Sequence, residues 1–307
     1  MIGATLNTGT RGDEESERFA LDMRSVRRSF DRAAGGYDAA AVLQSAVREV
    51  LLERLDLTRL APRFVLDAGA GTGRASRALK ERYPRARVIA VDFALGMLRT
   101  AKRRQSWLCR FDRVQADAER LPFGDASIDL IFSNLLLPWC DPDRLFAEFR
   151  RVLAPNGLLT CSGLGPDTLR ELRVAWAQVD AHRHVNQFID MHDLGDALVR
   201  AGFAAPVLDV DRYTLKYKDF RALALDLKAL GTRNFTAARQ RGLTAKGKLI
   251  EMQNAYEAFR EHDHLPATAE VVFAHAWAGG ELPRRRADGA SISLAELRRK
   301  LPGNRRP

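Results

Sequence analysis

The feature that most constrains the fold is an alternation of short apolar runs with helical patterns, which begins at residue 64. Apolar runs of strand length predict buried strands at 64–67, 87–92, 113–117, 128–134 and 157–161. Helical spacing predicts helices at 75–82, 96–104 and 143–153. Strands that alternate with helices in this way predict an α/β fold, in which a doubly wound, mostly parallel sheet is covered on both faces.

A glycine-rich loop follows the first of these strands. Its sequence is Val65-Leu66-Asp67-Ala68-Gly69-Ala70-Gly71-Thr72-Gly73, with glycine at alternate positions. Glycine lets the backbone turn tightly and approach a ligand where a Cβ atom would collide. The spacing differs from the GxGxxG fingerprint of an NAD site, and no Gly-Lys-Ser/Thr follows for a Walker loop. The next strand ends at Asp92, where a carboxylate can accept hydrogen bonds from both hydroxyls of a ribose.

The segments on either side of this core are expected to cover it. Helical spacing begins near Arg24, and the pair Gly35-Gly36 breaks it just before Tyr37. Farther on, helices are predicted at 168–179 and 191–201, and strands at 206–217 and 270–277. We therefore expect a disordered leader (1–23), a catalytic domain (24–278) and a basic, disordered tail (279–307). Within the domain we expect an N-terminal helical cover (24–60), a cofactor-binding core (61–165) and a helical lid inserted before the last strand (219–266).

Composition excludes several classes of protein. The chain has 307 residues and contains no apolar run near the ~18 to 20 residues of a membrane span, so no membrane partner is expected. The first 23 residues lack the apolar segment of a secretory signal, and the three cysteines form no disulfide framework, so we expect a cytoplasmic protein. Half of the net charge of +10 lies in residues 281–307, which favours a solvated basic tail and leaves an acidic partner as the alternative. No zinc spacing or other nucleic-acid motif is present, so we expect no nucleic-acid partner.

The core motifs resemble those of class I S-adenosylmethionine-dependent methyltransferases. The resemblance rests on Asp67-Ala-Gly-Ala-Gly-Thr-Gly, Asp92, Asp117-Ala118 and Leu153-Ala-Pro-Asn-Gly-Leu. It implies a seven-stranded, Rossmann-like sheet with S-adenosyl-L-methionine as methyl donor. The glycines would face the methionine end, Asp92 the ribose, Phe93 and Met97 the adenine ring, and Asp117 the adenine amino group, with Asn134 beside the sulfonium. The implied cofactor-binding residues are Asp67, Gly69, Ala70, Gly71, Gly73, Asp92, Phe93, Met97, Asp117, Ala118 and Asn134.

The flanking segments resemble one family of these enzymes, the malonyl-acyl-carrier-protein O-methyltransferases of biotin synthesis. The similar segments span residues 24–278 and include 28–38, 133–139, 165–172, 184–188, 226–231 and 270–277. The resemblance implies methylation of the free carboxylate of a malonyl group on an acidic acyl carrier protein. Such a carboxylate is already ionised at neutral pH, since its pKa lies near ~4, and it needs donors that hold it rather than a strong base. Tyr37 and His184 are our candidates for that catalytic role.

Two other functions stay open at this point. Residues 165–172 and 193–195 also resemble a methyltransferase-like family that assembles respiratory complex I and hydroxylates an arginine. A cofactor-binding protein without catalytic activity is the other alternative. We predict no metal site, because His182 and His184 have no third ligand at a standard spacing.

Overall fold

The computed structural model describes residues 21–235, 242 and 244–279. The predicted leader lies almost wholly outside these residues, and so does the predicted tail. Among the residues described, seven strands are found: β1 (Phe64–Ala68), β2 (Arg87–Asp92), β3 (Asp112–Gln115), β4 (Ile128–Ser133), β5 (Leu153–Leu164), β6 (Phe203–Tyr217) and β7 (Leu265–Ala278).

The same part of the chain contains helices and two short 3₁₀ turns. The helices are α2 (Met23–Ala33), α3 (Tyr37–Ala40), α4 (Val42–Arg54), α5 (Arg74–Arg82), α6 (Leu95–Arg103), α7 (Pro142–Val152), α8 (Arg170–Ala177), α9 (Met191–Arg200), α10 (Phe220–Ala229) and α11 (Lys246–Glu257). The 3₁₀ turns are η1 (Leu55–Leu57) and η2 (Leu137–Trp139).

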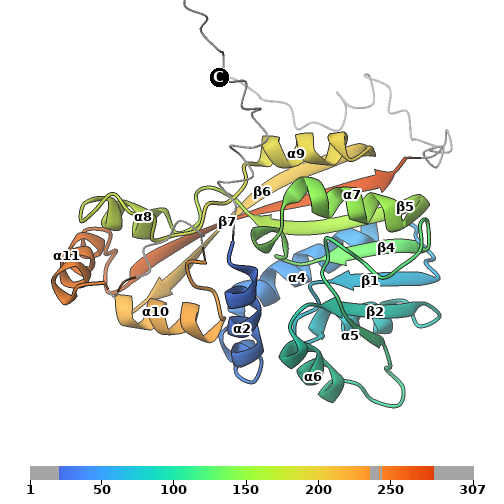
Figure 1. Cartoon of the computed structure of the whole chain (residues 1–307), viewed down its shortest axis with the longest axis horizontal. Helices are drawn as coiled ribbons and strands as arrows, with labels where there is room; N and C mark the ends of the chain where they lie inside the picture. The colour runs from blue at the N-terminus through green and yellow to red at the C-terminus, as the bar shows by residue number, and fades with distance from the viewer. Residues whose placement is uncertain (1–20, 236–241, 243, 280–307) are drawn as a thin grey trace, which may run out of the picture.

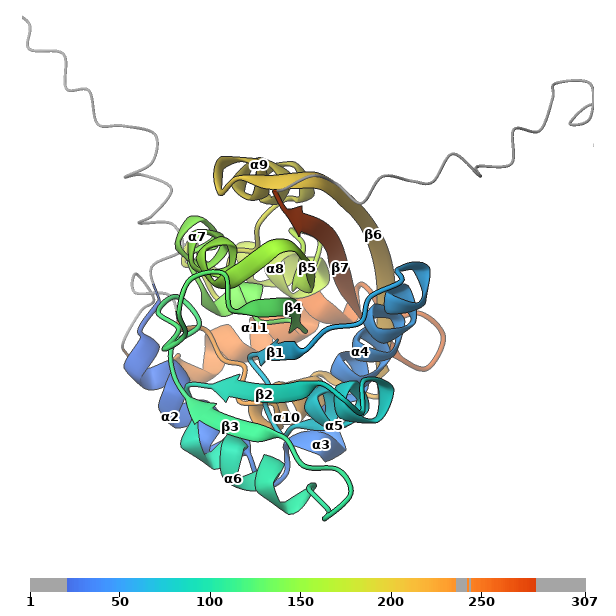
Figure 2. The same cartoon turned by 90° about the vertical axis from the view of Figure 1, so that its right-hand side faces the viewer.

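All seven strands form one sheet in the order β3-β2-β1-β4-β5-β7-β6. The first five run parallel, and β7 is antiparallel to both of its neighbours. Helices α7 and α9 pack on one face of the sheet, and α4 and α5 on the other, each through apolar side chains (Figure 2). The predicted α/β, doubly wound and mostly parallel fold is confirmed.

The order of the strands brings the predicted site together. Strand order reverses beside β1, and in such a sheet the crevice beyond the carboxyl ends of the strands is where ligands bind. The glycine loop follows β1, Asp92 ends β2, and Asn134 follows β4 directly. Asp117 lies in a turn beyond β3, which ends at Gln115 and is shorter than predicted.

Helices α8, α10 and α11 form a smaller cluster around the far ends of β6 and β7 (Figure 1). Helices α10 and α11 lie between these two strands in the sequence, as the polar pattern predicted. Strand β7 begins at Leu265, five residues earlier than predicted. The sequence Pro-Ala-Thr-Ala gives a weak strand signal, but pairing with β6 extends to Tyr217 opposite Leu265.

Helix α2 closes the remaining side of the carboxyl edge, next to α6 (Figure 1). Its side chain Phe30 packs with Met97 and Phe93, and the Asp31 carboxylate accepts a hydrogen bond of 2.8 Å from the backbone N–H of Gly96. Gly96 is forced to be small here, because a Cβ atom would lie 2.7 Å from the Asp31 carbonyl oxygen. The N-terminal helices are therefore fixed against the core.

Candidate active site

The glycine loop has a left-handed backbone at its three glycines. The φ angles are +71° at Gly69, +52° at Gly71 and +78° at Gly73. A Cβ atom on Gly71 would meet nothing within 4 Å, so its open side faces free space. A Cβ atom on Gly73 would lie 2.7 Å from the Cβ of Ala101. Gly71 thus leaves room for a ligand, whereas Gly73 allows α5 and α6 to pack closely.

Asp92 is the buried acid that faces this loop. One carboxylate oxygen accepts the Gly71 N–H at 2.8 Å, and the other accepts the Ala94 N–H at 2.8 Å. The side chain is buried, and burial raises the pKa of Asp92 to about 6, although the two N–H donors act in the opposite direction. Each carboxylate oxygen keeps one lone pair for a further donor. Asp92 is therefore ionised at neutral pH and able to accept ligand hydroxyls.

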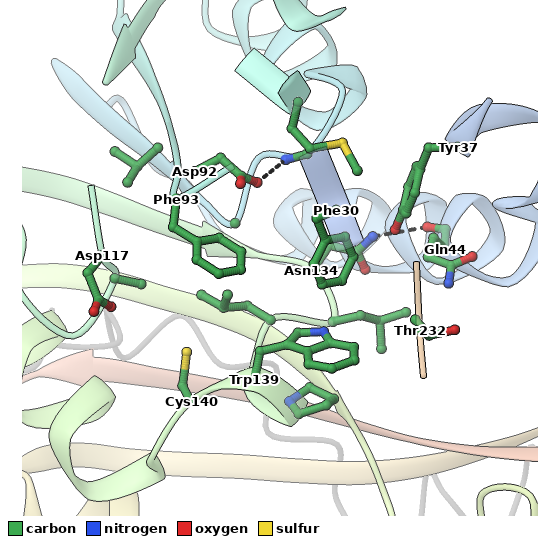
Figure 3. Close-up of a pocket in the computed structure, with 18 of the residues that line it drawn as sticks. Phe30, Tyr37, Gln44, Asp92, Phe93, Asp117, Asn134, Trp139, Cys140 and Thr232 are labelled. Atoms are coloured by element: carbon green, nitrogen blue, oxygen red, sulfur yellow. Dashed lines mark hydrogen bonds between the residues drawn. The ribbon is translucent and has the colours of Figure 1, made fainter. Parts of the chain in front are cut away.

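A cavity opens between the glycine loop, α2 and η2 (Figure 3). Eight of the predicted cofactor residues and the predicted catalytic Tyr37 line it. They are Tyr37, Gly69, Gly71, Asp92, Phe93, Met97, Asp117, Ala118 and Asn134. Phe93 and Met97 supply apolar surface, Ala118 is buried, and the exposed Asp117 accepts the Glu119 N–H at 3.0 Å. The apolar lining with a few polar groups suits a small-molecule ligand.

Three predicted cofactor residues lie outside this lining. Asp67 is buried beneath the loop, where it accepts a hydrogen bond from the hydroxyl of Ser76, and burial raises its pKa to about 7. Asp67 and Ala70 line a smaller space on the other side of Gly71, and Gly73 lines neither space. Asp67 thus supports the loop from below.

Charged side chains of both signs line the smaller space beside Gly71. They are Asp38, Arg48, Asp67 and Arg74. The Asp38 carboxylate accepts hydrogen bonds from the Thr72 hydroxyl at 2.7 Å and from Arg74 at 3.0 Å, and it pairs with Arg104. This network joins the segment after the glycine loop to α3. It could hold the amino and carboxylate groups of an amino-acid ligand.

Both the oxygen and the nitrogen of the Asn134 amide form hydrogen bonds within the protein. Its Oδ1 accepts the Ser162 hydroxyl at 3.0 Å, and its Nδ2 donates to the backbone oxygen of Gln44 at 3.0 Å. The side chain ties α4 to the tip of β4 and leaves the cavity wall rigid.

Tyr37 begins α3, directly after the glycine pair, and lies on the same side of the cavity as Gln44 and Asn134 (Figure 3). It lines both the large cavity and the space behind Gly71. Burial raises the pKa of Tyr37 far above its usual range, with a smaller contribution from Asp92. The phenol therefore keeps its proton and can donate a hydrogen bond.

His184 lies elsewhere. Its ring stacks on Trp176 with centroids 3.6 Å apart, and its Nε2 lies 2.8 Å from the Asp180 carboxylate. Asp180 also accepts from Lys248 at 2.9 Å, and the hydrogen bond from the Lys248 ammonium is the main cause that holds the pKa of Asp180 below its usual range. The sequence did not reveal the stacking of His184 on Trp176 or the ion pair of Asp180 with Lys248, because Trp176 belongs to α8 and Lys248 to α11. His184 lines a second cavity and does not line the first.

The second cavity lies between the core and the cluster of α8, α10 and α11. Its wall is mostly apolar, with His184, Asn186, Tyr217, Asp226, Thr232 and Arg233 among its polar residues. The Tyr217 hydroxyl donates to Asp226 at 2.8 Å, so these two polar side chains already have a hydrogen-bond partner within the protein. The two cavities share wall residues and therefore adjoin.

Several wall residues were not predicted as site residues. Phe30, Gln44, Leu136, Trp139 and Thr232 line the first cavity although they lie far apart in the sequence. The only available signal was local: Phe30, Gln44 and Trp139 stand in or beside segments that resemble one family. Nothing in those segments indicated that the three side chains meet in one cavity.

Two structural observations bear on metals and membranes. Within residues 21–235, 242 and 244–279, no group of three or more His, Cys, Asp or Glu side chains could hold a metal ion. Among the helices of that same part of the chain, none is long and apolar enough to span a membrane.

Solved structures with the same fold include methyltransferases. A Bacillus halodurans C-125 protein described as a methyltransferase has a TM-score of 0.53 at 18% identity, covering 75% of this chain and 99% of its own. The YcgJ protein of Bacillus subtilis has a TM-score of 0.55 at 16% identity, covering 75% and 98%. At this level of identity the likeness establishes the fold alone.

Sequence relatives define the family. A general methyltransferase domain family matches residues 66–161. A malonyl-[acyl-carrier protein] O-methyltransferase of Methylovorus sp. (strain MP688) is 55% identical and covers 85% of this chain and 91% of the relative. One from Gallionella capsiferriformans (strain ES-2) is 49% identical and covers 89% and 96%. The resemblance found in the sequence is confirmed, and the chain belongs to the family of malonyl-[acyl-carrier protein] O-methyltransferases.

Proposed function

We propose that the chain transfers a methyl group from S-adenosyl-L-methionine to the free carboxylate of a malonyl thioester carried by an acyl carrier protein. The observation that carries this proposal is the pair of adjoining cavities in a chain of this family, one beside the glycine loop and one beside α8, α10 and α11. The first has the features of a nucleoside site, and the second is a mostly apolar space that also presents polar side chains, which suits an acyl thioester.

The residues present fit the methyl donor. The open side of Gly71 leaves space for it, and Asp92 presents buried carboxylate lone pairs to ribose hydroxyls. Phe93 and Met97 offer apolar walls to the adenine, Asp117 and Ala118 lie at the edge of the cavity, and Asp67 supports the loop. When bound, S-adenosyl-L-methionine supplies a methyl group on a positively charged sulfur.

The protein's part in catalysis is placement and exclusion of water. The malonyl carboxylate is ionised at neutral pH, so no base has to remove a proton. Because methyl transfer neutralises charge on both reactants, an apolar environment favours it. Tyr37, whose phenol stays protonated, is the proposed donor on the cofactor side. We assign His184 to the wall of the acceptor cavity, where Trp176 and Asp180 hold it.

A basic surface lies beside the mouth of the first cavity. Helix α2 contributes Met23 and Phe30 to that cavity, and its residues Arg24, Arg27 and Arg28 are exposed. None of the three arginines forms an ion pair within the described part of the chain. An acidic carrier protein docked here would be attracted electrostatically and could deliver its thioester to the opening.

The product ester would hide a charge that fatty-acid elongation rejects, which fits an early step of biotin biosynthesis. We place the protein in the cytoplasm, since its three cysteines are free. We also propose that α10 and α11 form a lid over the acceptor cavity.

Mass spectrometry of the carrier protein tests the function. Malonyl-carrier protein incubated with the enzyme and S-adenosyl-L-methionine is expected to gain the mass of one CH₂ unit and to yield one S-adenosylhomocysteine per methyl transferred. Acetyl-carrier protein, which lacks a free carboxylate, is the matched control and should gain nothing. An unchanged malonyl-carrier protein, or a protein arginine that gains one oxygen instead, would overturn the proposal.

Salt dependence tests the docking surface. The KM for the carrier substrate is expected to rise with ionic strength, and Arg27→Glu combined with Arg28→Glu should raise it at low salt. Arg85→Glu is the matched control, because Arg85 is exposed just before β2, at the opposite edge of the sheet. Equal effects of the two substitutions, or a salt-independent KM, would contradict docking on α2.

A further inference from the structure

The two cavities meet at a small set of shared wall residues. These are Leu43, Gln44, Trp139, Leu164 and Thr232. A methyl donor in the first cavity and an acceptor in the second can react only where the cavities meet. The polar groups of this junction therefore lie where the reacting carboxylate would be, and Tyr37 lines the adjoining first cavity.

Among the residues that the structure describes, the junction contains no charged side chain. Asp92 and Asp117 line the first cavity only, and His184, Asp226 and Arg233 line the second only. A carboxylate at the junction would thus be held by neutral groups.

Of the three polar side chains at the junction, Gln44 and Trp139 have donors without a partner among the described residues. The third, Thr232, already donates its hydroxyl to the Leu227 carbonyl at 3.0 Å. The Gln44 amide has no hydrogen-bond partner among the described residues, and its Oε1 is buried. The Trp139 indole N–H likewise donates to no atom of the described residues. Both side chains border the same hollow, with the nitrogen end of the Gln44 amide directed toward Thr232 (Figure 3).

Both donors are held in place by the fold. The Trp139 ring packs edge-on against Phe30 at 5.1 Å and against Phe235 at 6.1 Å between ring centroids. The backbone of Gln44 is fixed by the Asn134 amide, which donates to its carbonyl oxygen at 3.0 Å. Donors fixed before the substrate arrives lose little free energy in reorganisation.

We propose that Gln44 and Trp139 bind the carboxylate of the acceptor and orient it for methyl transfer, an assignment that rests on the proposed function. An oxygen of the carboxylate uses a lone pair to form a bond to the methyl carbon as the carbon–sulfur bond breaks. The electron pair of that bond stays on sulfur, which becomes a neutral thioether, and the carboxylate becomes a neutral ester. No proton moves and no further reactant is needed.

Neutral donors suit this reaction better than an arginine. A guanidinium would bind the ionised carboxylate strongly, but that attraction is lost as the negative charge disappears in the transition state. An amide N–H and an indole N–H also fix the position of the carboxylate oxygens, and they lose less binding free energy as the negative charge disappears. They also discriminate against acyl groups that end in a methyl group, which would leave both donors unpaired in an apolar site.

The test uses variants that keep shape and remove the donor. Gln44→Met and Trp139→Phe should each lower kcat/KM for malonyl-carrier protein by about tenfold, as expected for one lost hydrogen bond to a charged group. The matched controls are Gln178→Met and Trp277→Phe, because neither residue lines either of these two cavities. The dissociation constant for S-adenosyl-L-methionine should stay within about twofold of wild type, since its proposed ligands are intact.

Binding of the acceptor separates carboxylate recognition from a purely structural role. Calorimetry with S-adenosylhomocysteine present should show that the wild type prefers malonyl- over butyryl-carrier protein and that both variants lose much of this preference. Equal weakening toward both carriers, or unchanged kcat/KM in both variants, would overturn the assignment. This binding measurement stands even where no ester forms, so it distinguishes failure of the assignment from failure of the proposed function.

Discussion

Replacement of Asp92 by alanine is expected to weaken binding of S-adenosyl-L-methionine by about 1 to 3 kcal/mol, or roughly 5- to 150-fold in the dissociation constant. The carboxylate is buried, and the Gly71 and Ala94 N–H groups at 2.8 Å hold it in one orientation. The variant would take away the charged acceptor for two ribose hydroxyls. It would also leave both backbone donors without their partner, which adds loop disorder to the loss.

The pH dependence follows from the same residue. Burial raises the pKa of Asp92 to about 6, so the carboxyl becomes neutral as the pH falls below that value. Because the hydroxyls prefer the ionised form, affinity should decline as the pH falls through 6, and binding near pH 6 should release protons. Asp92→Asn, which lacks the ionisation, should show a weaker pH dependence at lower overall affinity.

Isothermal titration calorimetry from pH 5 to 8, in buffers of different ionisation enthalpy, measures both effects. Circular dichroism shows whether each variant is folded. Asp112→Ala is the control, because Asp112 is an exposed acid that pairs with Arg87 and does not line the cavity. Unchanged affinity in a folded Asp92→Ala protein would remove Asp92 from the site, and a pH-independent wild-type affinity would refute the argument from its ionisation.

Three further changes test other parts of the site. Gly71→Val should abolish cofactor binding, because its Cβ enters the open cavity and a β-branched residue is strained at a φ of +52°; normal calorimetric affinity would mean that the loop is placed wrongly. Tyr37→Phe should lower kcat by about tenfold, equivalent to about 1.4 kcal/mol of barrier, if the phenol aligns the carboxylate; near-full turnover would leave Tyr37 a packing residue. The pKa of Asp67 is raised to about 7 in the fold and lies near 4 when unfolded, so between these values the folded state holds the extra proton and loses stability as the pH rises. Urea unfolding of the wild type relative to Asp67→Asn should show this loss between about pH 4 and pH 7, at no more than about 1.4 kcal/mol per pH unit, with no further loss above about pH 8; parallel stabilities from about pH 4 to 7 would contradict it.

The sequence by itself determined the core of this protein, because the relevant signals are local. Apolar runs of strand length, helical spacing and the glycines from Gly69 to Gly73 each act over a few residues. Since parallel strands present their carboxyl ends at one edge, Asp92 and Asn134 could be placed in one site before any contact was known. The predicted strand boundaries were less accurate where a strand end is set by pairing with a neighbouring strand rather than by hydrophobicity, as at Leu265 in β7.

The tertiary structure alone decided what each of these residues does. It showed that Gly73 allows two helices to pack closely and that the Asn134 amide forms hydrogen bonds with Ser162 and Gln44. It also showed that His184 stacks on Trp176 in a separate cavity. It also joined Gln44 from α4 to Trp139 from η2, at a junction that neither local segment indicates. The physical reason is that a local pattern reports burial and backbone conformation, whereas a hydrogen-bond partner or a cavity wall depends on how distant segments pack.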